Sequence, residues 1–462
     1  MSAAKEDRRF GGRLIGLIIA AGFAQMLVLI DYMAASVALP DMAKDFDTQP
    51  ATLQWVITGY ILSFSTMLGV AGPLGDRFGR KKLLQLGILL FGATSLWVGM
   101  AQSIPSLIAA RITLGFGGGL LFPLAIAVAS AGSPKALLPK TISIFTGIAT
   151  IGSAIGPVIG GVFTEELSWR WVFLINIPIA ILAIIAVALF AEESKDEQSS
   201  ERIDLLGIIM LISGLALLAA GIAGVPHWGT VVWLPLTAGG LAILTIFGLI
   251  ELRMVQPIID LRLFRNRTFV GYLIGGTLSN SAWCLLTFSN TLEMQEVLGY
   301  GAEKTGFIFL FMSASAAFAS FIGPLAQRLL GTKRLLLLAL LLQGVACLLL
   351  WIDHVQPWLS IALFISGFGC SWGWAMSQAG GIMTMPENKI GLASGAMLTV
   401  MIMVANLFLV VSAAFMEIGD GPQGKHDETG IQWTFMLALG CVAIGFITTF
   451  LIVPREASTG ND

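Results

Sequence analysis

The chain has 462 residues, of which 56% are hydrophobic and 12% are charged, and its mean hydropathy is +0.86. A soluble core cannot bury that much apolar surface, so the composition indicates an all-α membrane protein with many spans. The formal net charge of −2 excludes the strongly basic surface expected of a protein that binds nucleic acid.

Apolar stretches of about 20 residues, the length that crosses a bilayer as a helix, can be placed fourteen times. The N-terminal segment is charged and has no cleavage site before the first stretch, so we expect a retained span rather than a signal peptide. The predicted spans are 14–38, 51–72, 82–101, 105–130, 141–163, 171–191, 204–225, 230–252, 269–298, 303–326, 334–352, 358–382, 390–416 and 432–453.

Lysine and arginine positions define an orientation for these spans. With the N-terminus in the cytoplasm, 21 of the 26 Lys and Arg residues fall in cytoplasmic segments, four fall in the opposite loops, and Arg111 lies within a span. This is the positive-inside pattern of a multi-pass membrane protein, and an even number of spans places both termini in the cytoplasm.

A basic, glycine-marked loop occurs twice along the chain. Residues Gly72–Leu84 and Gly323–Leu336 share a Gly-Pro-Leu start, a central arginine, a glycine and a basic pair, and each lies between two apolar stretches. Gln327 replaces Asp76 in the second copy. A repeat at this distance predicts a duplicated helical bundle, the architecture of many secondary transporters.

The repeat and the polar segments predict five parts of the chain. Residues 1–191 form an N-terminal six-helix bundle, 192–203 a cytoplasmic linker, and 204–252 an inserted two-helix hairpin. Residues 253–268 form a cytoplasmic connection, and 269–462 a C-terminal six-helix bundle. Arginines in the 253–268 connection are interpreted as topogenic charge near anionic lipid headgroups.

Two ionisable residues lie within predicted spans of the first bundle. Asp31 is nine positions before Pro40, or about 13 Å along a helix, close to the middle of a ~30 Å hydrocarbon core. A carboxylate there costs several kcal/mol unless it is protonated, hydrated or paired, which suits proton exchange against a cation. Arg111 needs an acceptor, so we expect it to respond to a nearby carboxylate. The alternative for Asp31 is a structural carboxylate that is hydrogen-bonded to neighbouring helices, and the alternative for Arg111 is a fixed tie to backbone carbonyls.

Five segments resemble signatures of the major facilitator superfamily, most closely its fourteen-span drug:proton antiporter branch. Leu114 replaces a usual Gln of the Arg111–Gly117 segment, and Met33 and Ser36 replace a usual Thr and a usual Asn of the Ile30–Pro40 segment. The resemblance implies two six-helix bundles in a bacterial-type cytoplasmic (inner) membrane. The segments are Ile30–Pro40, Gly72–Leu84, Arg111–Gly117, Gly152–Gly161 and Trp169–Pro178.

The resemblance assigns roles to further residues. We expect a cytoplasmic gate in which Asp76 meets a helix N-terminus or an arginine, with a solvated turn as the alternative. The predicted gate comprises Gly72, Asp76, Arg77, Gly79 and Arg80. The Gly152–Gly161 segment resembles the antiporter signature of the fifth span and predicts a hinge, or close helix packing alone. Its residues are Gly152, Gly156, Pro157, Gly160 and Gly161.

Glu293 lies near the outer end of the ninth predicted span, three residues before Glu296. Glu293 is a candidate second site for a proton or a cation, whereas Glu296 is expected to be solvated at the interface.

The predicted function is proton-coupled antiport that exports hydrophobic, cationic small molecules by alternating access. No phosphate-binding Gly-x-x-x-x-Gly-Lys-Ser/Thr loop is present, so we expect the proton gradient, and no cofactor, to supply the energy. We expect no enzymatic activity and no metal, because the histidines His227, His354 and His426 all fall in predicted outside loops. The expected partners are the substrate, protons and membrane lipid, with the chain a monomer. Alternatives are the same fold carrying a metabolite, amphipathic lipid or siderophore, and a receptor or scaffold without transport.

Overall fold

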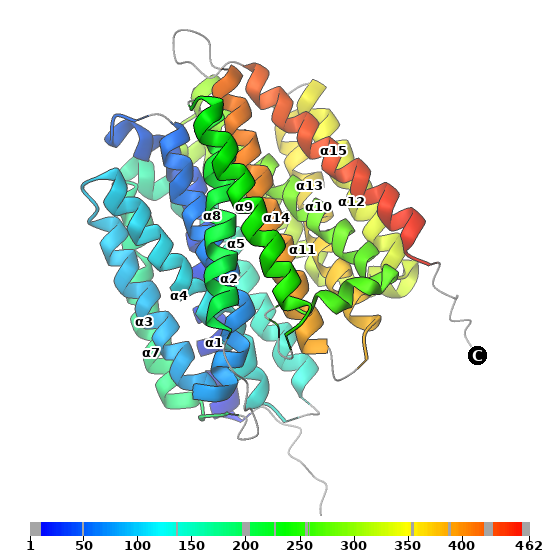
Figure 1. Cartoon of the computed structure of the whole chain (residues 1–462). Coiled ribbons are helices and arrows are strands. Elements are labelled where there is room, and N and C mark those ends of the chain that lie inside the picture. The colour runs from blue at the N-terminus through cyan, green and yellow to red at the C-terminus, as the bar shows by residue number, and fades with distance from the viewer. Residues whose placement is uncertain are drawn as a thin grey trace, which may run out of the picture. The chain divides into compact units, whose positions relative to one another are not determined.

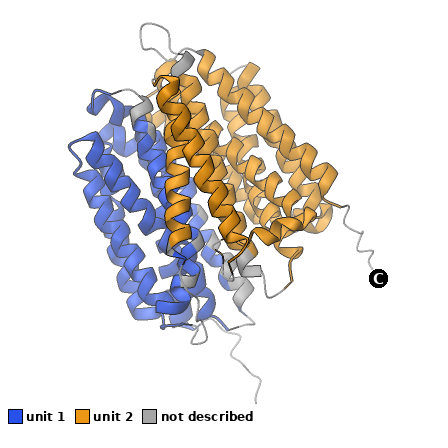
Figure 2. Cartoon of the chain, in the orientation of Figure 1, with its two compact units in different colours: residues 1–204 blue, residues 205–462 orange. Residues whose placement is uncertain are grey.

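The structure is a computed structural model that describes most of the chain. The described ranges are 11–48, 50–134, 137–195, 204–225, 228–254, 257, 259–352, 355–386, 390–419 and 428–454. The chain divides into two compact units, unit 1 (Met1–Asp204) and unit 2 (Leu205–Asp462), which are coloured separately in Figure 2.

Unit 1 is a bundle of helices (Figure 1). Its helices are α1 (Gly12–Asp45), α2 (Pro50–Phe78), α3 (Arg80–Gly99), α4 (Ile104–Ala131), α5 (Leu138–Glu166), α6 (Arg170–Leu174) and α7 (Asn176–Phe190).

Unit 2 is also helical in its described parts. Its elements are α8 (Leu205–Ala223), α9 (Thr230–Glu251), η1 (Leu261–Arg265), α10 (Arg267–Leu292), the π-helical turn η2 (Glu293–Val297), α11 (Ala302–Leu330), α12 (Thr332–Ile352), α13 (Trp358–Met383), α14 (Ile390–Gly419) and α15 (Glu428–Ile452). The predicted hairpin corresponds to α8 and α9, which pack on each other within this unit.

The prediction of an all-α protein with many membrane spans is confirmed. In the described residues, 13 helices are long and apolar enough to cross a membrane, and α2 adds a fourteenth if its two arms count as one span. The arms Trp55–Leu68 and Val70–Phe78 meet at 52°, with Gly69 between them.

Two predicted spans differ from the structure in detail. The first continues through Pro40 to Asp45, since a proline removes only one N–H from a helix that neighbouring helices support. The sixth is broken at Ile175 into α6 and α7. Pro178 explains the break, because it has no N–H to donate to the carbonyl of Leu174.

The two units repeat one packing scheme. In unit 1, α1 packs on α4, α5 and α7, and α4 packs on α2 and α3. In unit 2, α10 packs on α13, α14 and α15, and α13 packs on α11 and α12. Helices α10 to α14 therefore correspond to α1 to α5, and α15 corresponds to the broken pair α6–α7.

The repeated loops have the same backbone. Gly79 precedes α3 and Gly331 precedes the corresponding helix α12, each with a positive φ, 104° and 80° respectively. A side chain is strained in that conformation, which explains the glycine in both copies. The N–H of Gly79 donates to Gly75 O at 2.9 Å, and that of Gly331 donates to Gln327 O at 2.8 Å.

Candidate functional site

Asp31 and Arg111 form an ion pair inside unit 1. Nη1 of Arg111 lies 2.7 Å from Oδ2 of Asp31, and the two side chains are 1% and 0% exposed. Nε of Arg111 also donates to the backbone carbonyl of Val56 at 3.1 Å. The structure therefore gives Arg111 both acceptors considered above, a carboxylate from α1 and a backbone carbonyl from α2.

Asn176 completes the contacts of the Asp31 carboxylate. Its Nδ2 lies 3.3 Å from Oδ1 of Asp31 and 3.3 Å from Oγ of Ser95 on α3. Asn176 is the first residue of α7, so the break that Pro178 imposes on the sixth span places this amide at the level of Asp31. Oδ1 of Asn176 has no hydrogen-bond partner among the described residues.

Two aromatic rings cover the guanidinium group of Arg111. Its Cζ lies 4.3 Å from the ring centroid of Tyr60 and 5.3 Å from that of Phe173. A cation over an aromatic face gains about 0.5–2 kcal/mol, with the larger values in desolvated sites. Tyr60 thus packs on Arg111.

This arrangement is an ion pair whose two side chains are both buried. Burying two charges carries a desolvation penalty that their attraction repays only when the geometry and the additional hydrogen bonds are good. Removing one partner alone costs about 3–5 kcal/mol, because it leaves an uncompensated charge. The protonation state of Asp31 and the position of Arg111 are therefore linked.

The glycines of α5 face the helix that carries Asp31. A Cβ on Gly156 would lie 2.7 Å from Cβ of Met33, and one on Gly160 would lie 2.7 Å from the backbone carbonyl of Ala34. A Cβ on Gly152 would clash with Met26. Within the same helix, Pro157 and Gly161 are buried. The segment thus lets α1 and α5 approach closely on both sides of Asp31 along α1.

The predicted gate residues lie at the α2–α3 connection of unit 1. Nε of Arg80 is 2.8 Å from Oδ1 of Asp76, with side chains 31% and 33% exposed, so Asp76 meets an arginine. The Arg77 side chain is exposed and its Cζ is 5.3 Å from the ring centroid of Phe78. Gly72 has open space where a Cβ would lie.

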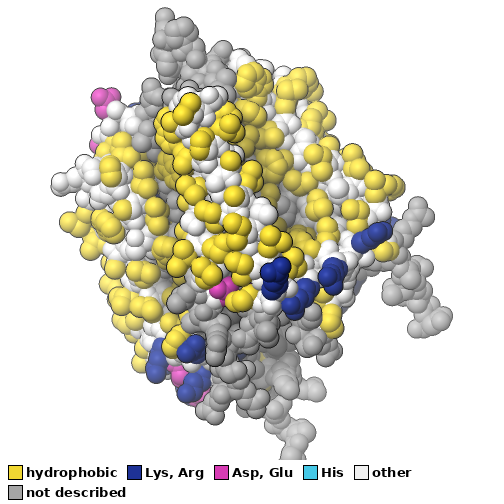
Figure 3. Space-filling view, in the orientation of Figure 1, with side chains coloured by type: hydrophobic (Ala, Val, Ile, Leu, Met, Phe, Trp, Pro, Cys, Tyr) yellow, Lys and Arg dark blue, Asp and Glu magenta, His cyan; other side chains and the backbone are white. Residues whose placement is uncertain are grey.

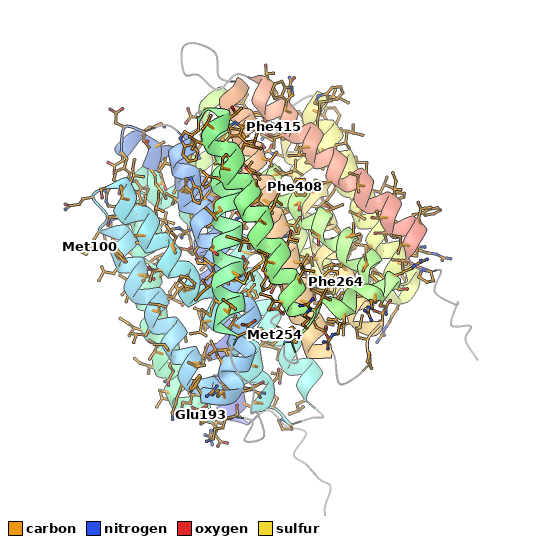
Figure 4. The ribbon with its side chains drawn as sticks, viewed as in Figure 1. Met100, Glu193, Met254, Phe264, Phe408 and Phe415 are labelled. Carbon is orange, nitrogen blue, oxygen red and sulfur yellow. The ribbon has the colours of Figure 1, made fainter. Side chains whose placement is uncertain are left out.

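Glu193 at this connection was not identified from the sequence. Its Oε1 accepts the N–H of Lys81 at 3.1 Å, and its Oε2 accepts the N–H of Lys82 at 3.3 Å. The carboxylate therefore caps the N-terminus of α3 from a segment 110 residues away, the labelled position in Figure 4. Nothing local in the sequence around Glu193 signals this partner.

An ion pair between Asp45 and Arg170 joins the C-terminal end of α1 to the N-terminal end of α6. Nη1 of Arg170 lies 2.6 Å from Oδ2 of Asp45, and Nη2 of Arg170 donates to Ala101 O at 3.2 Å. Nε1 of Trp169 also donates to Oδ2 of Asp45 at 3.0 Å. The Trp169–Pro178 segment was singled out in sequence, but its partner Asp45 was not.

Glu293, the third predicted coupling residue, lies in unit 2. It begins η2 at the end of α10 and is 2% exposed, whereas Glu296 is exposed. Of the three predicted coupling residues, the structure brings Asp31 and Arg111 together in unit 1.

Comparisons with known proteins agree with this architecture. The sequence model of the Major Facilitator Superfamily matches residues 21–312 and 269–462. The chain is 38% identical over 306 residues to the cephamycin export protein of Amycolatopsis lactamdurans, a match that covers 63% of this chain and 61% of that protein's length. It is 30% identical over 399 residues to the multidrug resistance protein Stp of Mycobacterium tuberculosis, covering 82% and 72% of the two chains.

A solved structure supports the fold. A bacterial homolog of the human lysosomal transporter Spinster superposes with a TM-score of 0.69 at 14% sequence identity, covering 96% of this chain and 98% of that one. At this identity the similarity concerns the fold alone.

Proposed function

Because the chain belongs to the Major Facilitator Superfamily, whose members compared above are transporters and not enzymes, we propose that it is a proton-coupled antiporter. It exports hydrophobic, cationic small molecules across the cytoplasmic membrane by alternating access, as a monomer and without a cofactor. The relatives named for multidrug resistance and for cephamycin export support export as the direction. The positive-inside distribution of Lys and Arg supports cytoplasmic termini.

The observation that carries this proposal is the buried pair of Asp31 and Arg111. In the described state the carboxylate is satisfied by Arg111 and Asn176. A proton on Asp31 removes its negative charge and with it the attraction for Arg111. Arg111 keeps the Val56 carbonyl and the Tyr60 ring as partners, so its guanidinium group still has stabilising contacts when Asp31 is protonated.

Asn176 suits both protonation states of Asp31. Its Nδ2 donates to the carboxylate, as observed. A protonated carboxyl is a donor, and Oδ1 of Asn176 is an acceptor with no partner among the described residues. Rotation of the amide therefore satisfies the neutral acid as well.

Exchange follows from competition for one carboxylate. A proton, Arg111 and a cationic substrate each neutralise Asp31, which is the one acidic side chain among the contacting groups described above. Substrate binding in the inward-open state then favours release of the proton, and protonation in the outward-open state favours release of the substrate.

Flux in proteoliposomes tests the proposal. The full chain is reconstituted with an imposed pH gradient, and transport of a cationic dye is followed together with luminal pH. Asp31→Asn is expected to abolish gradient-driven flux while the protein stays monodisperse. Asp41→Asn is the matched control on the same helix, because Asp41 is partly exposed and contacts the exposed Lys44 at 3.4 Å. Wild-type flux in Asp31→Asn contradicts proton coupling through Asp31.

A narrower cargo is the second candidate function. The relative named for cephamycin export favours a single antibiotic-type metabolite over a broad set of cations. A substrate panel that includes neutral and anionic metabolites separates the two, since a dedicated exporter transports one class only. Absence of flux for the whole panel would favour a receptor or scaffold.

A further inference from the structure

A cavity of ≈ 300 Å³ lies between η1, α10 and α15 of unit 2. It is lined by three apolar residues and one arginine, Phe264, Val270, Ile452 and Arg267. Figure 4 labels Phe264 at this end of the unit. The cavity lies where α10 begins and α15 ends, which is the depth at which a membrane helix meets lipid headgroups.

Hydrogen bonds fix the walls of this cavity. Nζ of Lys333 donates to the carbonyls of Phe450 and Val453 and so holds the end of α15. Oδ1 of Asn266 accepts the N–H groups of Thr268 and Phe269, so the first turn of α10 is already capped. Because these N–H groups of α10 are already paired, the Arg267 side chain rather than the helix N-terminus is the group available to attract an anion.

Charges at this end of unit 2 are separated by sign. Glu251 and Asp260 are buried and accept the backbone N–H groups of Ile259 and Arg262. The arginine side chains are exposed instead. Those that form no ion pair with a described residue are Arg253, Arg262, Arg265, Arg267, Arg328 and Arg334.

The surface shows the same separation. Lys and Arg side chains lie in a row along the lower edge of unit 2, directly beneath a broad apolar surface (Figure 3). A basic edge below an apolar belt matches the phosphate and acyl regions of one lipid leaflet.

We propose that this cavity binds an anionic phospholipid. The phosphate contacts Arg267, and the glycerol and upper acyl carbons contact Phe264, Val270 and Ile452. The remaining exposed arginines raise the local concentration of anionic lipid. If these arginines served only to orient the spans, no cavity would be needed and no single arginine would matter more than the others. A lipid site instead makes Arg267 more important than the other arginines, so the two interpretations make different predictions. The proposal does not depend on the transported substrate.

Native mass spectrometry of the delipidated full chain tests the site. The protein is titrated with phosphatidylglycerol and with phosphatidylcholine that carries the same acyl chains. We expect tighter binding of phosphatidylglycerol, and Arg267→Gln should weaken it about fivefold, the equivalent of ~1 kcal/mol for one arginine at an anionic surface. Val270→Phe fills the cavity without changing charge and should weaken binding as well.

Arg328→Gln is the matched control, because Arg328 is an exposed arginine in the last turn of α11 that does not line the cavity. It should weaken binding less than Arg267→Gln does, because Arg328 only adds to the positive potential near the cavity. An equal loss in Arg267→Gln and Arg328→Gln, or equal binding of the two lipids, overturns the proposal. Displacement of phosphatidylglycerol by inorganic phosphate also overturns it, because the site would then take free anions. If Arg267→Gln fails to fold by thermal unfolding, Val270→Phe decides.

Discussion

Lys81 and Lys333 perform the same task in the two units. Nζ of Lys81 donates to Ala188 O at 2.9 Å and Ala191 O at 2.8 Å, at the C-terminal end of α7. Nζ of Lys333 donates to Phe450 O and Val453 O, at the C-terminal end of α15. In each unit a cation therefore satisfies the last carbonyls of the final helix, where the helix dipole is negative.

Replacing these lysines should destabilise the protein. Hydrogen bonds to charged groups contribute about 1.5–3 kcal/mol to stability. Lys81→Met should therefore lower the free energy of unfolding by about 1.5 kcal/mol or less, and Lys333→Met, at the more buried lysine, by about 3 kcal/mol. Thermal unfolding of the purified protein in one detergent measures both. Lys82→Met is the control, since Lys82 is exposed and its side chain makes no hydrogen bond with a described residue. Equal effects of Lys81→Met and Lys82→Met would contradict the capping role.

The repeat was predictable because its signal is local. A Gly-Pro-Leu start, a glycine, a basic pair and two flanking apolar runs lie close together in sequence and identified both loops. The positive φ of Gly79 and Gly331 came from the structure. The task of Lys81 and Lys333 was not predictable, because their acceptors lie more than 100 residues away. Sequence also identified Asp31 and Arg111 as unusual, since each is an ionisable group within an apolar stretch.

The ion pair of unit 1 makes a double-mutant prediction. Arg111→Gln alone leaves the Asp31 carboxylate buried without its cation, which should cost about 3–5 kcal/mol and reduce the yield of folded protein. Asp31→Asn combined with Arg111→Gln removes both charges and should recover most of that stability. Thermal unfolding and yield measure the cycle, and transport should stay absent in the double variant.

An additive result would contradict this prediction. If the double variant is as unstable as the sum of its two single variants, the charges of Asp31 and Arg111 do not compensate each other in the folded protein. Recovery of proton-driven flux in the double variant would instead show that the pair is structural and that coupling lies elsewhere.

The glycine face of α5 predicts sensitivity to a single methyl group. Gly160→Ala places a Cβ against the backbone of Ala34, which cannot rotate away, so overpacking should cost about 1–3 kcal/mol. Gly147→Ala on the same helix is the control, because nothing lies within 4 Å of its added Cβ. Thermal unfolding reports packing, and flux per folded protein reports a hinge. Slower flux at unchanged stability in Gly160→Ala would favour the hinge over packing.

Asn176, Glu193 and Asp45 show why the rest of the site was not found from sequence. Asn176 is a polar residue between apolar neighbours, and only the break before α7 and the packing of α1, α3 and α7 bring it to Asp31. Glu193 and Asp45 follow apolar stretches and read as ordinary helix-end acids. Their partners, Lys81 and Arg170, come from other helices.

Asp76→Asn should slow turnover more than it weakens substrate binding. The Asp76–Arg80 pair is about one-third exposed, and such surface pairs contribute about 0–1 kcal/mol, so stability should change little. Flux against substrate concentration separates maximal rate from apparent affinity. Arg80→Gln breaks the same pair and serves as the comparison. A large loss of affinity at an unchanged maximal rate argues against a gating role for Asp76.

Glu293 and Glu296 provide a matched pair of acids on one turn. Both belong to η2, a π-helical turn, and such turns often occur at functional sites because they re-aim side chains. Glu293 is buried, with 2% of its surface exposed, whereas Glu296 is exposed. The two residues are the same type and lie three positions apart on one turn, so burial is the main difference between them.

Glu293→Gln should therefore reduce transport of dicationic compounds more than transport of monocations, which need only Asp31. At ~4 Å a pair of unit charges gains about 1 kcal/mol in water but about 4 kcal/mol at an effective dielectric constant near 20, so the buried acid has the larger effect. Flux of a matched mono- and dicationic pair, normalised to the wild type, measures this difference. Glu296→Gln should leave both fluxes unchanged. An equal loss for both compounds in Glu293→Gln, or a loss for neither, would make Glu293 a structural acid at the end of α10.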